Sequence, residues 1–270
     1  MVTFPNAKIN LGLYVTEKRP DGFHNIESCF YPVQWTDILE IIPAQGFAFS
    51  STGIAIPGDP ATNLCAKAYH LMQKDHSLPP VHIHLHKTIP IGAGLGGGSA
   101  DGAFTIKVLN SLFNLGLQTP EMEAYARPLG SDCAFFIRNE PVYCFGKGDQ
   151  FEDIQVDLSQ YFIVLVNPQV HVGTAEAYAG IIPKQPEYAV KETLALPIQN
   201  WKYRLSNDFE TTVCAKYPVI RDIKNTLYAQ GALYASMSGS GSTVYGIFEK
   251  EKDVTGIFPP NFMIWQGKLG

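Results

Sequence analysis

The stretch Ile89-Pro-Ile-Gly-Ala-Gly-Leu-Gly-Gly-Gly-Ser-Ala-Asp-Gly102 places six glycines between residues 92 and 102. It follows an expected strand over 81–87 and precedes an expected helix over 99–114. Each glycine costs conformational entropy on folding, so this density indicates a close approach of the backbone to another group. At a helix N-terminus that group is typically an anion, because unpaired N–H groups and the helix dipole point at it. The stretch therefore predicts a phosphate-binding loop rather than a flexible surface loop.

The composition indicates a globular chain. Of the 270 residues, 46% are hydrophobic and 17% are charged, which is enough apolar material for a core. The net charge of −5 is spread without a basic cluster, so we expect no nucleic-acid partner. Five scattered cysteines form no CxxC pair, which predicts reduced thiols. With no signal or membrane-spanning run, we expect a cytoplasmic protein without a membrane partner, as a monomer or weak homodimer.

Strands and helices are mixed without regular alternation. A strand is expected over 3–14, with Lys8 and Asn10 on the face opposite its apolar residues. A helix after residue 118 should have Thr119 as its N-cap and Pro120 at its first position. The remaining strands are expected at 26–42 (one or two), 142–145, 162–166, 232–236 and 244–248, and the remaining helices at 63–74, 174–181, 207–216 and 219–230. This order favours an α+β fold over a doubly wound sheet.

Three histidines, His82, His84 and His86, alternate with apolar residues in the strand before the glycine stretch. Such a row could bind a metal ion. A solvent-facing row is the favoured interpretation, because no carboxylate or further ligand is near in sequence.

Three known phosphate loops do not fit. The Walker A pattern needs a Lys-Ser or Lys-Thr pair after its last glycine, and none is present. Gly92, Gly94 and Gly97 match the dinucleotide fingerprint, but the expected helix leads into Gly116-Leu-Gln-Thr-Pro-Glu121 and another helix, where that fold needs a strand. The protein-kinase loop lies between two strands, whereas here a helix follows.

The run from Pro90 to Asp101 resembles the glycine-rich loop of the GHMP small-molecule kinase superfamily. Ala7-Lys8-Ile9-Asn10-Leu11 is similar to that superfamily's N-terminal motif, and Ser238-Gly-Ser-Gly-Ser242 is similar to its third motif. The resemblance covers almost the whole chain. It implies an N-terminal ATP-binding domain over 1–155, similar to the second domain of ribosomal protein S5, and a ferredoxin-like domain over 156–270.

Two further segments narrow the resemblance. Pro20-Asp-Gly-Phe-His24 and Leu129-Gly-Ser-Asp132 are similar to segments of the family of kinases that act on 4-diphosphocytidyl-2-C-methyl-D-erythritol. That family implies transfer of a phosphoryl group from ATP, with Mg²⁺, to the 2-hydroxyl of this cytidine diphosphate-linked methylerythritol. The chain departs from the family pattern at Phe23, where tyrosine is usual, and at Ala100 and Gly102, where serine and alanine are usual.

The resemblance also implies roles for single residues. Asp132 would be the catalytic base, and Lys8 would be the cation beside it. The expected ATP-binding residues are Pro90, Gly92, Gly94, Leu95, Gly96, Gly97, Gly98, Ser99, Ala100, Asn63 and Lys87, with Ser99 as a candidate magnesium ligand. The expected substrate residues are Asn10, Phe23, His24, Thr174 and Tyr178, with Phe23 and Tyr178 on either side of cytosine. Two alternatives stay open, namely a GHMP kinase for homoserine or mevalonate and a non-catalytic sensor of the same fold.

Overall fold

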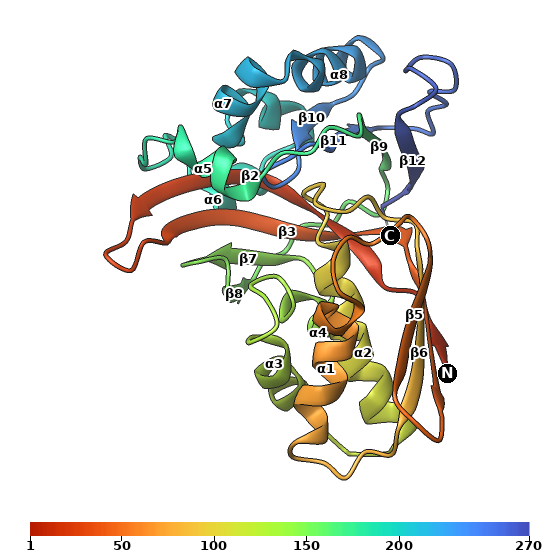
Figure 1. Ribbon diagram of the computed structural model, residues 1–270. Coiled ribbons are helices and arrows are strands. Elements are labelled where there is room, and N and C mark those ends of the chain that lie inside the picture. Colours follow the sequence, from red (N-terminus) through yellow and green to blue (C-terminus); the bar gives the residue numbers. More distant parts are fainter. Residues whose placement is uncertain (270) are drawn as a thin grey trace. The chain divides into compact units, whose positions relative to one another are not determined.

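The computed structural model describes residues 1–269 and divides the chain into two compact units (Figure 1). The first unit contains Met1–Ala7, Trp35–Ile91 and Gly96–Glu140, and the second contains Lys8–Gln34, Gly92–Leu95 and the residues from Pro141 onward. This division differs from the expected boundary at residue 155. The chain enters the second unit early because strands from its N-terminal part share a sheet with strands that follow residue 141.

The first unit is a four-stranded sheet with helices. The sheet order is β1-β4-β6-β5, in which β4 is antiparallel and β5 is parallel to β6. Its strands are β1 (Val2–Thr3), β4 (Ile38–Pro43), β5 (Ala48–Gly53) and β6 (Val81–Lys87). Its helices are the 3-10 turn η1 (Pro60–Thr62), α1 (Leu64–Gln73), α2 (Gly97–Leu112), α3 (Thr119–Ala126) and α4 (Phe135–Arg138).

The second unit holds two four-stranded sheets and the remaining helices. The sheet orders are β2-β3-β7-β8 and β10-β11-β9-β12. The strands are β2 (Asn6–Lys18), β3 (His24–Thr36), β7 (Val142–Phe145), β8 (Gln150–Asp153), β9 (Phe162–Asn167), β10 (Tyr234–Met237), β11 (Val244–Phe248) and β12 (Met263–Lys268). The helices are α5 (Thr174–Ala179), α6 (Val190–Leu194), η2 (Ile198–Tyr203), α7 (Phe209–Lys216) and α8 (Pro218–Ala229).

Helix α2 is buried on nearly all sides, as its apolar sequence predicts. Gly102 lies where α1 begins, and a Cβ added to it would lie 3.1 Å from Cβ of Leu64. The missing side chain therefore lets α1 and α2 pack closely. This contact explains a glycine in a helix, where it costs about 1 kcal/mol against alanine.

The α+β prediction is confirmed, and several elements lie at their expected bounds. The observed bounds of β6, β7 and β11 are identical to the bounds expected from the sequence. The expected cap of α3 was wrong by one position, because Gln118 is the N-cap and forms a capping box with Glu121. Strand β2 has no solvated face between Asn6 and Val15, because Lys8 and Asn10 are buried like their apolar neighbours.

The five cysteines are free thiols, in agreement with the sequence prediction. Within residues 1–269, no helix combines the length and the apolar character needed to cross a bilayer.

Candidate active site

The glycine stretch forms a loop that leads into α2, and three of its glycines have a left-handed backbone conformation. Gly92, Gly94 and Gly96 have φ values of 63°, 79° and 70°, a region that side chains other than glycine rarely adopt. Gly96 is the N-cap, and its carbonyl accepts the first helical hydrogen bond from the N–H of Ala100 at 2.9 Å. The helix therefore begins at Gly97, two residues before the expected start.

Gly94 and Ser238 bring the two glycine-rich loops together within the second unit. The Ser238 hydroxyl donates to the Gly94 carbonyl oxygen at 2.8 Å. A Cβ on Gly94 would lie 1.9 Å from the Ser238 carbonyl oxygen. This close approach of the two loops leaves no room for a side chain at position 94, which explains the glycine there.

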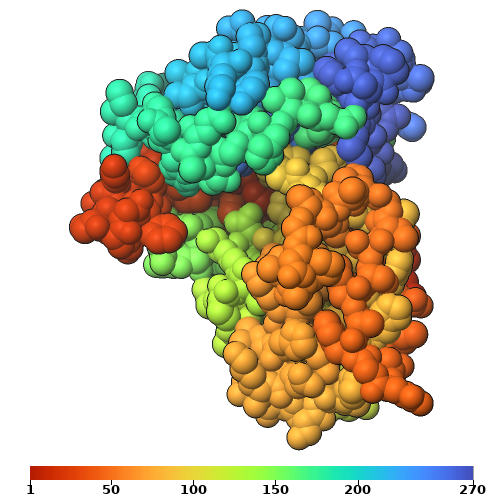
Figure 2. Space-filling view, viewed as in Figure 1, coloured from red at the N-terminus to blue at the C-terminus, as the bar shows by residue number. Residues whose placement is uncertain are grey.

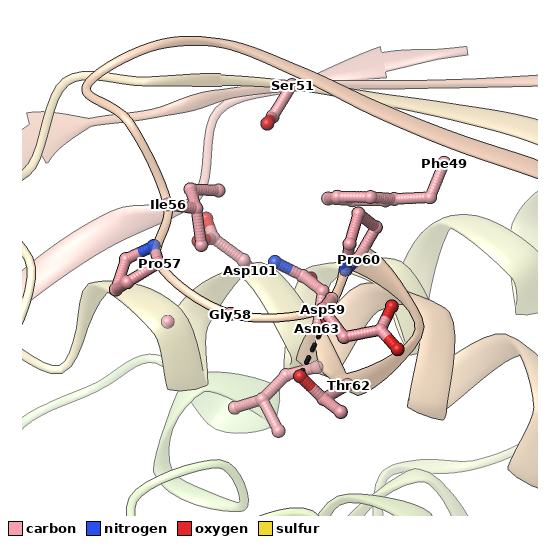
Figure 3. Close-up of a pocket in the computed structure, with 12 residues that line it drawn as sticks. Phe49, Ser51, Ile56, Pro57, Gly58, Asp59, Pro60, Thr62, Asn63 and Asp101 are labelled. Atoms are coloured by element: carbon pink, nitrogen blue, oxygen red, sulfur yellow. Dashed lines mark hydrogen bonds between the residues drawn. The ribbon is translucent and has the colours of Figure 1, made fainter.

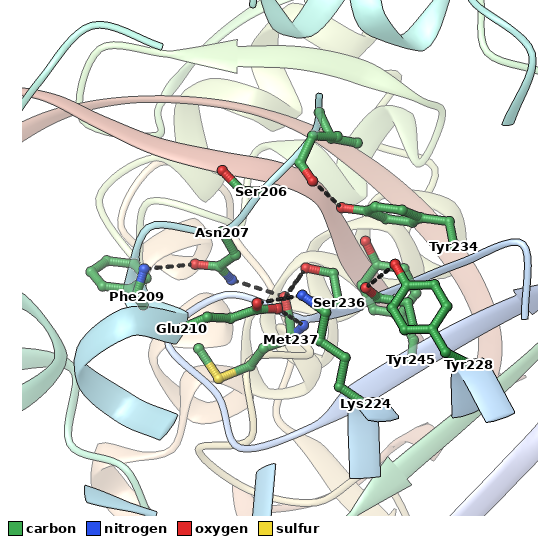
Figure 4. A network of polar contacts seen from close by, with 12 residues as sticks. Ser206, Asn207, Phe209, Glu210, Lys224, Tyr228, Tyr234, Ser236, Met237 and Tyr245 are labelled. Carbon is green, nitrogen blue, oxygen red and sulfur yellow. Dashed lines mark hydrogen bonds and ion pairs between the residues drawn. The ribbon is translucent and has the colours of Figure 1, made fainter. Parts of the chain in front are cut away.

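Two side chains at the start of α7 hold the Ser238 loop (Figure 4). The Asn207 amide donates to the carbonyl oxygens of Met237 and Gly239, each at 2.8 Å. The Glu210 carboxylate accepts from the Met237 N–H at 2.7 Å and is paired with Lys224. The loop is thus fixed by buried polar contacts rather than by packing alone.

Lys8 and Asn10 lie in a buried network of the same unit. The Lys8 ammonium donates to Oδ1 of Asn10 at 2.6 Å and lies 4.6 Å from the centroid of the Phe30 ring. The Asn10 amide donates to the Ser28 hydroxyl, and the Asn10 N–H donates to the Ser238 hydroxyl at 3.3 Å. Asn10 is therefore oriented by contacts on both sides. The Lys8 N–H donates to the Leu95 carbonyl, which ties this strand to the glycine stretch.

The N-terminus of α2, in the first unit, presents Gly97, Gly98 and Ser99. A Cβ on Gly97 would lie 2.9 Å from Cγ2 of Ile89, so protein packing requires this glycine. Apart from its chain neighbours and the backbone of its own helix, no described atom lies within 4 Å of a Cβ on Gly98. The open space at Gly98 is therefore available to a ligand at the positive end of the helix.

The loop that carries Asp132 lies against this helix terminus. The Ser99 hydroxyl oxygen is 3.9 Å from where a Cβ on Gly130 would be. The Cys133 thiol is hydrogen-bonded to the Ser99 side chain, and burial raises its pKa to about 12. Asp132 is half-exposed beside it. The expected base and the expected phosphate-binding residues from Gly96 to Ala100 thus come from adjacent segments of the first unit, whereas Gly92, Gly94 and Leu95 belong to the second unit. Lys8 belongs to the other unit, and its pairing with Asp132 stays a prediction.

A pocket of about 200 Å³ opens beside the same helix terminus (Figure 3). Its lining comes from β5, the following loop, and the first turns of α1 and α2: Phe49, Ser51, Ile56, Pro57, Gly58, Asp59, Pro60, Thr62, Asn63, Leu64, Gly98 and Asp101. The segment between β5 and α1, orange in Figure 2, lies on the surface of the first unit. Asn63 also caps α1, because its Oδ1 accepts from the Cys65 N–H at 2.9 Å. The pocket joins flat apolar walls to a few polar groups, as nucleotide sites do.

A buried ionic cluster that the sequence analysis did not predict lies behind this pocket. The Lys87 ammonium is paired with Asp37 and, at 2.8 Å, with Oδ2 of Asp101. Asp37 also accepts the N–H groups of Thr88 and Ile89. The Lys87 side chain is thus held by two carboxylates, so any contact between it and a nucleotide stays a prediction. A lone acidic residue on an otherwise apolar helix was the signal that could have identified Asp101.

Asp101 differs from the other members of the cluster in its electrostatics. Burial raises the pKa of Asp101, Lys87 lowers it and Asp37 raises it again, with a net value of about 7. Burial alone would lower the pKa of Lys87, but the two carboxylates raise it. The cluster therefore keeps a charged lysine and a carboxyl group that exchanges its proton near neutral pH.

The expected substrate residues meet in part within the second unit. The turn closes with the Arg19 N–H bonded to the Phe23 carbonyl at 2.8 Å, and the Phe23 side chain is 58% exposed. The His24 ring stacks on Tyr178, with centroids 4.8 Å apart and an angle of 21°. Thr174 is the first residue of α5, the helix that carries Tyr178. One face of Tyr178 is thus covered by His24, and a cytosine between Phe23 and Tyr178 stays a prediction.

The three histidines of β6 form a surface ladder with hydroxyl groups of β5. Ser50 bridges His82 and His84 at 3.0 and 2.8 Å, and Thr52 bridges His84 and His86 at 3.1 and 2.9 Å. Within the described part of the chain, no group of three or more His, Cys, Asp or Glu side chains is arranged to hold a metal ion. The three histidines are half-buried, and the ladder lies on the opposite face of β5 from Phe49 and Ser51.

Comparison with known proteins identifies the family. The chain matches the models of the GHMP kinases N terminal domain over 63–140 and the GHMP kinases C terminal over 198–258. It is similar to 4-diphosphocytidyl-2-C-methyl-D-erythritol kinases of Cytophaga hutchinsonii (55% identical, 94% of each chain covered) and Parabacteroides distasonis (49% identical, 100% of each covered). A solved structure of 4-(cytidine 5'-diphospho)-2C-methyl-D-erythritol kinase superposes with a TM-score of 0.76 at 29% identity, covering 92% of this chain and 90% of that one. The chain therefore belongs to the 4-diphosphocytidyl-2-C-methyl-D-erythritol kinase family of the GHMP kinases.

Proposed function

We propose that this protein is an ATP-dependent kinase that phosphorylates the 2-hydroxyl of 4-diphosphocytidyl-2-C-methyl-D-erythritol, in the non-mevalonate route to isoprenoid precursors. The observation that carries the proposal is the convergence, in one unit, of a glycine-lined helix N-terminus, a pocket and the Asp132 loop. Phosphoryl transfer is mainly a matter of positioning and charge stabilisation, and these parts suit both tasks.

In this proposal the N–H groups of Gly97, Gly98 and Ser99 hold the phosphates of ATP. The first N–H groups of a helix have no partner within the helix, and the helix dipole favours an anion there. The loop before the helix contains Pro90, Gly92 and Leu95. Ala100 lies in the first turn of the helix. The nucleoside would occupy the neighbouring pocket, in contact with Asn63.

Magnesium would neutralise the phosphates and is part of the proposal. Mg²⁺ prefers oxygen ligands and usually binds one or two protein groups together with substrate phosphates. The Ser99 hydroxyl and the Asp132 carboxylate can each provide an oxygen ligand and lie on adjacent segments, so these groups fit the coordination preference of Mg²⁺. Ser99 is the residue that would hold it.

Asp132 would accept the proton of the attacking hydroxyl, and Lys8 would stabilise the charge that develops. On the acceptor side, Asn10 would bind the methylerythritol portion, and His24 would bind the edge of cytosine. The remaining residues of the proposed acceptor site are Phe23, Thr174 and Tyr178. The exposed Phe23 ring supports a role in stacking on a base. We also propose that the enzyme acts in the cytoplasm, as a monomer or weak homodimer.

The test is an ADP-release assay with purified protein, ATP, Mg²⁺ and the cytidyl substrate. Substrate-dependent ADP release is expected. If ADP were released only with homoserine or mevalonate, the chain would be a different GHMP kinase. If the chain bound ATP and the cytidyl substrate but released no ADP, it would be a sensor, and the kinase proposal would be wrong.

A further inference from the structure

One oxygen of Asp101 has no hydrogen-bond partner although it is buried in a polar cluster. Asp101 is 2% exposed and lines the pocket beside α2. Its Oδ2 is paired with Lys87, whereas within residues 1–269 its Oδ1 contacts no donor. A buried acceptor without a partner destabilises the folded state, and does so more strongly when it is charged. A ligand that donates a hydrogen bond to Oδ1 would remove this cost.

The same pocket contains a complementary donor. The Oδ1 of Asn63 already accepts the Cys65 N–H, so the remaining group of this amide is its NH₂. Asn63 and Asp101 therefore offer a donor and an acceptor to one ligand (Figure 3). Adenine presents the matching pattern, because its exocyclic amine donates and the adjacent ring nitrogen accepts. Hypoxanthine has the same size but carries a carbonyl oxygen, which accepts, in place of the amine.

We infer that Asp101 selects the base of the phosphoryl donor, because its unpartnered Oδ1 accepts a hydrogen bond from the exocyclic amine of adenine. This inference rests on the proposed kinase function and deepens it, since it assigns a specificity-determining residue to the nucleotide pocket. The ribose hydroxyls are the other donors of a nucleotide, and the experiment separates them from the amine.

The first experiment measures the affinities of ATP, ITP and 2'-deoxyATP by calorimetry with Mg²⁺. In the wild type we expect ATP to bind about tenfold or more tightly than ITP, since hydrogen bonds to charged groups are the stronger ones. In Asp101→Asn the amide oxygen should stay with Lys87, so that its NH₂ faces the base. The preference for ATP should then disappear or reverse. Asp75→Asn, an exposed carboxyl of the same unit, is the matched control and should keep it.

Equal affinities for ATP and ITP in the wild type would overturn the inference, as would an unchanged preference in Asp101→Asn. A tenfold loss with 2'-deoxyATP, together with tight ITP binding, would assign Oδ1 to the ribose and also overturn it. If the chain bound no nucleoside triphosphate at all, the proposed function itself would fail. Nucleotide binding without discrimination would remove only the inference.

The second comparison needs no variant. The ratio of the ATP and ITP affinities in the wild type tests the inference even if Asp101→Asn does not fold.

Discussion

The hydroxyl of Ser238 donates a 2.8 Å hydrogen bond to the carbonyl oxygen of Gly94, which joins two glycine-rich loops that are 144 residues apart in the chain. Gly94 has a φ of 79°, and a Cβ on it would approach the Ser238 carbonyl oxygen to 1.9 Å. A methyl group added at residue 94 would therefore clash with a backbone atom. No side-chain rotation could relieve that clash.

Gly94→Ala should lower the free energy of unfolding by more than about 3 kcal/mol, because left-handed strain and a backbone clash add together. The matched control is Gly116→Ala, with φ of 72° and open space around the added Cβ. Strain alone should cost the control about 1–2 kcal/mol. Urea denaturation of both variants tests this, and equal losses would contradict the steric argument.

Gly98→Ala should leave stability unchanged, or raise it by up to about 1 kcal/mol, because its Cβ meets open space in a helix. The KM for ATP should rise about tenfold or more, since small displacements of a reacting group are costly. Steady-state kinetics and thermal unfolding check the two effects. Gly46→Ala, also open but remote from the loop, is the control. An unchanged KM would remove Gly98 from the phosphate site.

Asn207→Ala should destabilise the protein by about 2–4 kcal/mol, because it leaves the buried carbonyl oxygens of Met237 and Gly239 without a donor. Chemical denaturation gives the size of the effect. Asn200→Ala, an exposed position in the same unit, should change stability by less than about 0.5 kcal/mol. Similar values for the two variants would mean that the Ser238 loop does not depend on this amide.

Asp132→Asn should reduce kcat by about 10²–10⁴-fold, the usual contribution of a general base, while the dissociation constant of ATP stays within about twofold. Single-turnover kinetics and calorimetry measure the two quantities separately. The control is again Asp75→Asn. Near-normal turnover in Asp132→Asn would exclude Asp132 as the base.

Asp101 should also make stability depend on pH. The pKa of Asp101 is raised by burial from its ordinary value of 3.8 to about 7 in the folded protein, so the folded state binds more protons between these pH values. Its contribution to stability is present in full below about pH 4 and is lost as the pH rises toward 7. Replacement by asparagine removes this loss. The stability of Asp101→Asn relative to the wild type should thus increase from pH 5 to pH 8, as measured by urea denaturation. A constant difference would contradict the assignment.

Local signals in the sequence located much of the fold. Strand β6 was predictable because apolar residues alternate strictly between Val81 and Lys87, and the start of α1 was predictable from Asn63 as a cap. Strands β5 and β12 were missed. Their residues are mostly polar or mixed, and their pairing partners lie far along the chain, with Ala48 opposite His82 and Met263 opposite Asn167.

Site residues were predictable where they belong to a local sequence motif. They were not predictable where their environment arises from contacts between distant parts of the chain. The glycine loop and the helix that follows it were predictable from composition and order, and the binding of an anion there stays a prediction. Asp101 did not stand out, because its partners Lys87 and Asp37 join it only in the folded chain. Lys8 likewise matched a solvated strand lysine, since the sequence does not show that both faces of β2 are covered.

The position of β12 has a consequence for biosynthesis. Strand β9, buried along its whole length, pairs on one side with β11 and on the other with Met263–Lys268. The ribosome adds roughly 5–20 residues each second, so the 96 residues from Asn167 to Met263 take roughly 5–20 s. During that time the nascent chain carries an unpaired apolar strand, which is a template for association with other chains. The demand for chaperones should therefore peak during translation, before the second unit can close.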